Sequence, residues 1–420
     1  MLASWLFLGV SLWGAAFTVN ALWPQRGMVV QVVLSFFNAW LTTELALHHI
    51  LWQAVCSAIF VWYGALDAWP GWLGAGITLL SWAGLAHLFL EGHRDGEVVG
   101  EALVEALGED YLAGIDVAHR RHMRPTIEWR RLVWPFRQHR EEVMRLTNVP
   151  YTETGRRRHR LDIYKRRDLA RGAPVLLQIH GGAWMIGDKS NQGLPLMYHL
   201  AERGWLVVAI NYALSPRATW PEHLIDCKRA LAWIRENAEE HGGDPDFVVV
   251  TGGSAGGHLA AMVALTANDP ELQPGFEEVD TQVAAFIPFY GVFDWTNRFD
   301  QRGKRDALKD RLERFIVKAS RDSHPEIYDR ASPMSHVKGS IPPAMVLHGR
   351  KDNLAPVEEA QQFVTQLREV SEEPVVYVEF AGAHHAFDLF PSVRALHAIH
   401  GVEAFAAWVA SQRRGPRKTS

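Results

Sequence analysis

The first 90 residues contain only three formally charged side chains, Arg26, Glu44 and Asp67. Residues 2–23 are uncharged throughout. At a rise of about 1.5 Å per residue, a helix of this length crosses a hydrocarbon core of about 30 Å. A surface in contact with water needs far more charge than this region has. We therefore expect residues 1–90 to form a transmembrane helical region.

Two further runs, residues 45–66 and 68–90, resemble the first in length and character. Residues 28–43 are shorter and more polar, so they form either a fourth span or a helix in the membrane interface. An ionised carboxylate at the middle of a bilayer costs roughly 3 kcal/mol, so we expect Glu44 and Asp67 to mark the ends of spans. The sequence thus predicts a multi-pass region of three or four spans.

Two alternatives remain open for this apolar region. A cleaved signal peptide would account for residues 1–23 at most, and this stretch lacks the basic start that such peptides carry. A soluble bundle of wholly buried helices is the second alternative. Four neighbouring apolar runs with almost nothing polar between them fit lipid better.

A basic zone follows. Residues 119–140 contain seven arginines against one acid, Glu128, and interleave them with aromatic side chains. Because such a composition suits anionic headgroups, we assign residues 91–145 to a basic juxtamembrane linker. A solvated linker without a specific partner is the alternative. The positive-inside bias then places this zone and the domain after it in the cytoplasm, on the plasma membrane, with the N-terminus outside for three spans and inside for four.

From residue 146 onward, short apolar runs alternate with helical patterns. The runs are rich in β-branched residues and almost continuously hydrophobic, as in parallel strands that are covered on both faces. This alternation predicts a doubly wound, mostly parallel α/β sheet over residues 146–412, with a disordered tail at 413–420. The expected strands are residues 174–180, 204–212, 246–253, 283–290, 343–349 and 374–380.

The stretch VVVTGGSAGGHLAAM, residues 248–262, places Ser254 between an expected strand and an expected helix, with glycines on both sides. A G-x-S-x-G nucleophile turn requires this context, because the turn is sharp, excludes Cβ atoms at its glycines and holds the serine hydroxyl clear of the backbone. The turn also lies at the carboxyl end of the sheet, where ligands bind in such folds. We therefore predict that Ser254 is a nucleophile.

A serine needs a base to accept its proton and a third group to orient that base. In hydrolases with this turn the chain order is serine, acid, histidine. Asp352 and the pair His384–His385 each follow an expected strand, so these loops can meet at one edge of the sheet. Asp294 and Asp388 are weaker candidates for the acid because they stand in the wrong place in this order.

The stretch HGGAW, residues 180–184, follows another expected strand. Gly181 and Gly182 let the backbone approach a ligand closely, and the loop at this position of such folds presents N–H groups to a developing oxyanion. The N–H of Ala255, next to the predicted nucleophile, would complete this cradle. A glycine turn without a catalytic role is the alternative.

The motifs HGGAW, GGSAGG, HGRKDNLAP and HHAF, in this order, resemble those of the α/β-hydrolase superfamily, and within it the hormone-sensitive-lipase-like esterases. The resemblance covers roughly residues 146–410. It implies hydrolysis of carboxylic esters of small to medium acyl length without a cofactor. The implied roles are nucleophile, acid and base for Ser254, Asp352 and His385, and oxyanion donors for Gly181, Gly182 and Ala255.

The resemblance also decides between the two adjacent histidines. The catalytic histidine of the family is commonly followed by a small residue and then phenylalanine, which here aligns His385 with Ala386 and Phe387. One position departs from the family: Ala183 stands where many relatives have a third glycine. The acyl or alcohol preference of those relatives therefore does not carry over.

The sequence thus predicts a membrane-anchored serine carboxylesterase or lipase that acts on small to medium or lipophilic esters, with membrane lipids as its other partner. Cys56 and Cys227 have no metal-type spacing, and a formal net charge of -4 argues against a nucleic-acid partner. An amidase, formamidase or acyltransferase of the same fold, or a non-catalytic membrane module, remains the alternative. Residues 292–340 form either a cap or a solvated surface helix, and the oligomeric state stays open.

Overall fold

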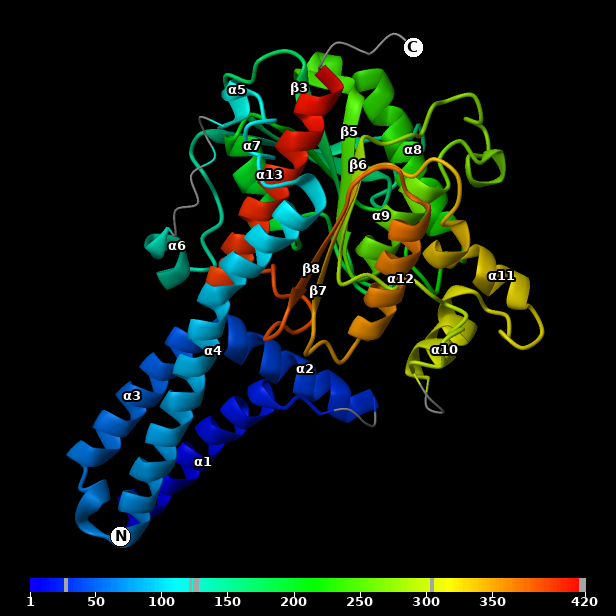
Figure 1. Cartoon of the computed structure of the whole chain (residues 1–420). Coiled ribbons are helices and arrows are strands. Elements are labelled where there is room, and N and C mark those ends of the chain that lie inside the picture. The colour runs from blue at the N-terminus through cyan, green and yellow to red at the C-terminus, as the bar shows by residue number, and fades with distance from the viewer. Residues whose placement is uncertain (26–28, 121–122, 124–127, 303–305, 415–420) are drawn as a thin grey trace.

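The structure, a computed structural model, describes residues 1–25, 29–120, 123, 128–302 and 306–414. Its centre is an eight-stranded sheet in the order β1-β2-β4-β3-β5-β6-β7-β8 (Figure 1). β1 pairs antiparallel with β2, and β2 with β4, while the neighbours from β4 to β8 run parallel. The strands are β1 (Val143–Pro150), β2 (Arg160–Arg166), β3 (Ala173–Ile179), β4 (Leu206–Ile210), β5 (Gly243–Gly253), β6 (Ala285–Phe289), β7 (Ala344–Gly349) and β8 (Val375–Phe380).

The doubly wound, mostly parallel α/β sheet is confirmed, and β3 to β8 coincide with the six strands expected from the apolar runs. The antiparallel pair β1 and β2 was not expected. Both strands carry charged or polar side chains at several positions, and although residues 161–164 of β2 are buried, neither strand has the continuous hydrophobicity of the other six.

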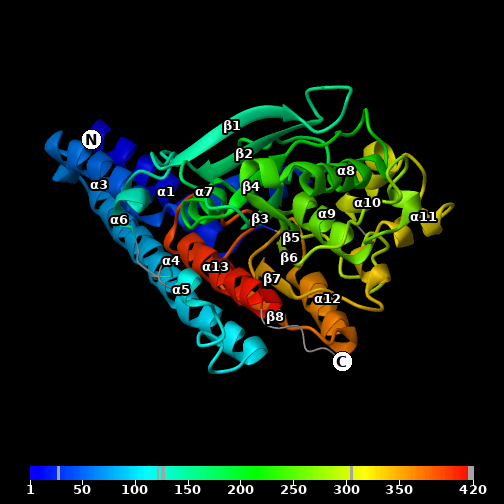
Figure 2. The ribbon, with the colours of Figure 1, turned by 90° about the horizontal axis from the view of Figure 1, so that it is seen from above.

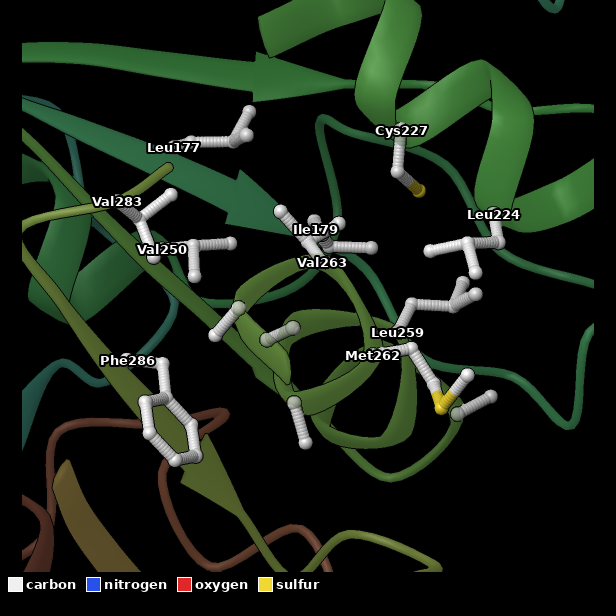
Figure 3. Packing of buried hydrophobic residues seen from close by; sticks show 14 of the residues in the cluster. Leu177, Ile179, Leu224, Cys227, Val250, Leu259, Met262, Val263, Val283 and Phe286 are labelled. Carbon is white, nitrogen blue, oxygen red and sulfur yellow. The ribbon is translucent and has the colours of Figure 1, made fainter. Parts of the chain in front are cut away.

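Helices cover both faces of the sheet, and each face has its own core. Side chains alternate along each strand: Leu177 and Val250 join the core beneath α8 and α9, whereas Leu176 and Val249 join the core beneath α7 and α13. Figure 3 shows the first core, where α9 side chains pack toward α8 and the strands. The helices of this region are α7 (Leu194–Glu202), α8 (Glu222–Asn237), α9 (Ala255–Leu265), α10 (Ala307–Arg311), α11 (Pro325–Arg330), α12 (Val357–Val370) and α13 (Val393–Arg414).

The N-terminal helices form a bundle that projects from the hydrolase-like sheet region (Figure 1). They are α1 (Leu2–Leu22), α2 (Val29–Glu44), α3 (Ala46–Trp62) and α4 (Trp69–Leu107), and two short helices follow them, α5 (Val117–Arg120) and α6 (Trp129–Val133). α1 and α4 are long and apolar enough to cross a membrane. α2 and α3 pass the same test only together, and they bend by 91° at the break between them.

α4 belongs to both parts of the molecule. Its first half lies in the bundle, and its second half runs beside α13 (Figures 1 and 2), where Val99, Ala102 and Leu103 enter the same core as Ile399 and Val402. The predicted boundary between residues 90 and 91 therefore falls inside one continuous helix. The predicted tail at 413–420 lies outside the described residues, except for its first two positions in α13, and part of the basic zone, residues 121–122 and 124–127, also lies outside them.

The interface between α1 and α4 is built from small and hydroxyl side chains. Thr18 hydrogen-bonds to Ser81 at 2.8 Å, and Thr78 to Ser11 at 3.0 Å, all four residues being buried. Many large apolar side chains of these helices point outward instead, although Phe7, Leu8, Leu85 and Leu88 are buried. The exposed members on these two helices include Trp5, Leu6, Leu12, Trp13, Val19, Leu79 and Leu80.

One buried ion cluster joins the bundle to the sheet region. Arg394 of α13, 2% exposed, donates to Glu44 at the end of α2 (2.6 Å) and to Asp95 of α4 (2.5 Å). Ser392 donates to the second oxygen of Glu44 at 2.5 Å. Glu44 and Asp67 both lie at helix ends, as expected for carboxylates that flank apolar segments, but Glu44 is neutralised inside the protein.

Replacing Arg394 tests this cluster. We expect Arg394→Met to lower the free energy of unfolding by about 3–5 kcal/mol, because two carboxylates would stay buried without a counter-charge. The matched control is Arg166→Met, which removes an exposed pair with Asp168 and should cost less than about 1 kcal/mol. Thermal unfolding in detergent measures both variants; equal stability losses would contradict a central role for Arg394.

Candidate active site

Ser254 lies in a strained turn between β5 and α9, with φ 59° and ψ −121°. A residue other than glycine rarely adopts such angles, and they raise the side chain above the backbone. Two glycines make the turn possible: a Cβ on Gly252 would lie 2.5 Å from the carbonyl oxygen of Ile179, and one on Gly256 would collide with the same oxygen. The nearby end of β3 therefore imposes glycine at both positions.

Asp352 and His385 are joined by a hydrogen bond. His385 Nδ1 lies 2.6 Å from Asp352 Oδ2, and both side chains are buried. The other carboxylate oxygen accepts from the N–H groups of Leu354 and Ala355, at 2.8 and 2.9 Å. Burial alone would raise the pKa of Asp352, but the neighbouring His385 and His348 outweigh it and hold that pKa well below its usual range. The carboxylate is therefore ionised and fixed in direction.

The strands that carry these residues are neighbours, in the order β5-β6-β7-β8, so their loops lie at one edge of the sheet. Tyr290, just after β6, contacts the predicted base. The N–H of Ser254 donates to Phe289, next to Tyr290, and the Tyr290 ring lies 4.6 Å from the His385 ring. Among the described residues, the Ser254 hydroxyl has no hydrogen-bond partner, a looseness common before substrate binds.

The two competing acids have other partners. Asp388 accepts a hydrogen bond from the Tyr290 hydroxyl, and burial raises the pKa of both groups. Asp294 accepts from the N–H groups of Thr296 and Arg298. His385 is thus hydrogen-bonded to Asp352 rather than to either competitor. Nothing in the sequence pointed to Tyr290, because its contact with His385 joins two distant loops.

The predicted oxyanion donors are not equivalent. The N–H of Gly181 donates to the side-chain oxygen of Gln192 at 2.7 Å, so this amide is engaged. The N–H groups of Gly182 and Ala255 have no acceptor among the described residues, and Ala255 opens α9. The loop therefore offers two free amides beside Ser254. Gln192 lies outside every motif, so its role could not be predicted from the residues alone.

His384 does not share the site with His385. Its Nε2–H donates to the carbonyl of Ala21, in the last turn of α1, at 3.0 Å. Burial lowers the pKa of His384 to about 4, so the ring is neutral at ordinary pH. The neighbour of the predicted base therefore fastens its loop to the first apolar helix.

His258, one turn after Ser254, braces the glycine loop. Its Nδ1 accepts from the Trp184 indole at 3.2 Å, while its Nε2–H donates to the Ala331 carbonyl at 2.8 Å. The bond at Nδ1 requires the neutral ring, because only an unprotonated nitrogen can accept, and burial lowers the pKa of His258 to about 3. Among the described residues, no group of three His, Cys, Asp or Glu side chains is arranged to hold a metal ion.

Comparison with known proteins gives the relatives of this chain. Residues 161–367 match the family model described as BD-FAE. The chain is 54% identical to the probable carboxylic ester hydrolase LipM of Mycobacterium tuberculosis over 271 residues, 64% of this chain and 62% of LipM. It is 46% identical to the esterase LipQ of the same organism over 284 residues, 67% of this chain and 66% of LipQ. The matched parts thus span slightly less than two thirds of these relatives.

Solved structures support the fold. A truncated carbohydrate esterase from gut microbiota superposes with a TM-score of 0.53 at 22% identity, covering 62% of this chain and 96% of that one. Esterase B from Lactobacillus rhamnosis gives 0.52 at 22% identity, covering 65% and 88%. At this identity the likeness concerns the fold alone.

The buried His258 predicts a pH dependence of stability. Between its unfolded pKa near 6.5 and its folded pKa of about 3, the unfolded chain binds a proton that the folded chain does not. The free energy of unfolding should therefore fall as the pH drops through this window, by up to about 1.4 kcal/mol per pH unit for this group. Thermal midpoints between pH 7 and 4 should decline less steeply in His258→Asn than in the unaltered protein. An unchanged slope would contradict the assignment.

Proposed function

The chain belongs to the α/β-hydrolase superfamily, and we propose that it is a membrane-anchored serine carboxylesterase. The observation that carries the proposal is the hydrogen bond between His385 and an ionised Asp352, formed at the sheet edge where a strained turn presents Ser254. The names of LipM and LipQ support an ester substrate. We expect small to medium or lipophilic acyl groups.

In the proposed mechanism, Ser254 Oγ attacks the ester carbonyl carbon and passes its proton to His385 Nε2. Asp352 stabilises the resulting imidazolium through Nδ1. The N–H groups of Gly182 and Ala255 hold the oxyanion, and Gly181 can join them once Gln192 releases it. Collapse of the intermediate expels the alcohol, which takes the proton from His385. Water, activated in the same way, then splits the acyl-serine and regenerates the hydroxyl.

Membrane anchoring is supported by the inverted pattern of the bundle. In a soluble bundle most large apolar side chains would face inward, whereas here serine and threonine form hydrogen bonds in the contact between α1 and α4 and many tryptophan and leucine side chains face outward. Small and hydroxyl residues are typical of helix contacts in lipid.

We further propose three spans, α1, α3 and the first half of α4, with the catalytic region in the cytoplasm. This path puts the N-terminus and Asp67 on the opposite side of the membrane from the sheet. It also puts the basic zone on the cytoplasmic side, which fits the positive-inside bias; Arg26 itself lies outside the described residues. A reporter fused to the N-terminus should read as external, and a cytoplasmic signal would contradict this topology.

A paired-substrate assay tests the enzymatic proposal. We expect hydrolysis of p-nitrophenyl butyrate but not of the matched p-nitroanilide, because an ester loses its alcohol far more readily than an amide loses its amine. Hydrolysis of both at similar rates would favour an amidase, and transfer to an added alcohol in place of hydrolysis would favour an acyltransferase.

Substitutions test the residues. Ser254→Ala and His385→Ala should each lower kcat by more than about a thousandfold and abolish labelling by a fluorophosphonate probe, and Asp352→Asn should lower kcat by about 10⁴. The matched control is His384→Asn, next to the base, which should retain most of the activity. A Ser254→Ala enzyme that stays active would show that another residue is the nucleophile.

A further inference from the structure

The helix α2 lies against the candidate active site. Phe36 of α2 is buried, and its ring meets the His385 ring edge-on, with centroids 6.0 Å apart and planes at 78°. Trp40, one turn later, stacks on Phe390 just after the histidine loop, at 5.4 Å. Figure 1 shows α2 crossing below β7 and β8. The inner face of α2, Phe36 and Trp40, therefore covers the imidazole.

α2 is fastened to the loops that carry the predicted acid and base. Asn353, next to Asp352, donates to the carbonyl of Gln25, just before α2, at 3.2 Å. At the other end, Glu44 is held by Arg394. A side chain of the acid loop and a side chain of α13 thus fix both ends of the helix over the site.

The outer face of α2, Leu34 and Phe37, is exposed, at 60% and 50%. Both large apolar side chains thus stay at least half exposed, whereas Phe36 and Trp40 on the inner face are buried. Further exposed apolar side chains lie at and after α6, where Phe136 packs on Phe390, the residue that also stacks on Trp40 of the inner face. These side chains are Val133, Trp134 and Phe136.

The bend between α2 and α3 indicates what covers the outer face of α2. The two helices meet at 91°, so α2 runs parallel to the membrane plane when α3 runs across it. Its outer face then continues the apolar exterior of the spanning helices α1 and α4. A helix in this position buries its apolar face about 5–10 Å into the boundary between headgroups and acyl chains.

We propose that α2 is the membrane-facing wall of the active site, so that the substrate is an ester whose acyl chain resides in the bilayer and reaches Ser254 from the membrane side past Phe36. The inference rests on the proposed esterase function and adds the class and route of its substrate. The inner face of α2 contacts the site, and the outer face contacts lipid. An ester held in the membrane then needs no passage through water.

Charging the outer face tests the route. The full chain, with and without the double substitution Leu34→Glu and Phe37→Glu, is placed in phosphatidylcholine vesicles and given p-nitrophenyl acetate in water or p-nitrophenyl palmitate in the bilayer. We expect kcat/KM for the palmitate to fall at least tenfold, while kcat/KM for the acetate stays within twofold. The matched control, Val370→Glu, charges an exposed valine at the end of α12 and should alter neither.

The outcome is decided by comparing the loss of kcat/KM for the palmitate with the loss of kcat/KM for the acetate. Equal loss on both esters, or no loss on either, would overturn the proposal. Absence of acetate hydrolysis in the unaltered chain would instead refute the esterase function, so the two failures are distinguishable.

A spin-label measurement, which does not depend on enzymatic activity, tests the proposal even if the charged variant does not fold. A nitroxide on Phe37→Cys, in a chain with Cys56→Ser, should be relaxed more strongly by oxygen, which partitions into the bilayer, than by a water-soluble nickel complex. Stronger relaxation by nickel would place the outer face in water. Broadening between labels on two chains would place a second copy there. Either result would overturn the proposal.

Discussion

Arg394 lies at the junction of the two parts of the molecule, paired with one carboxylate from α2 and one from α4. A buried guanidinium needs counter-charge, and here the counter-charges come from the last residue of α2 and from the second half of α4. Because Arg394 of α13 must be paired, the end of α2 with Glu44 and the part of α4 around Asp95 must lie beside α13. The apolar N-terminal helices are in this way packed into the hydrolase fold rather than merely attached to it.

That junction has consequences for the chemistry at the sheet edge. The predicted acid and base sit on loops whose next residues, Asn353 and His384, hydrogen-bond to the backbone around α1 and α2. The predicted nucleophile depends on a separate constraint, the close approach of β3 to the β5–α9 turn, which admits only glycine at Gly252 and Gly256. The sheet thus positions the Ser254 hydroxyl, whereas the apolar helices help to position the His385 imidazole.

Much of the arrangement could be predicted from the residues alone. The six parallel strands followed from continuous runs of β-branched residues, and the loop positions of Ser254, Asp352 and His385 followed from what comes after each strand. The partners of these residues could not be predicted. Gln192 engages one predicted oxyanion donor, and the rings of Tyr290 and Phe36 pack against His385, although none of these residues belongs to a motif.

The sequence by itself determined the local structure: the apolar helices, the strands and the strained serine turn. Hydropathy and steric exclusion act between residues that are near in the chain, so their pattern can be recognised in the amino-acid sequence alone. The tertiary structure alone decided that His384 meets a carbonyl 363 positions away, that Glu44 pairs with Arg394, and that Phe36 of α2 packs against His385. These outcomes depend on which surfaces approach within a few ångströms, and that distance is set by the packing of the whole chain.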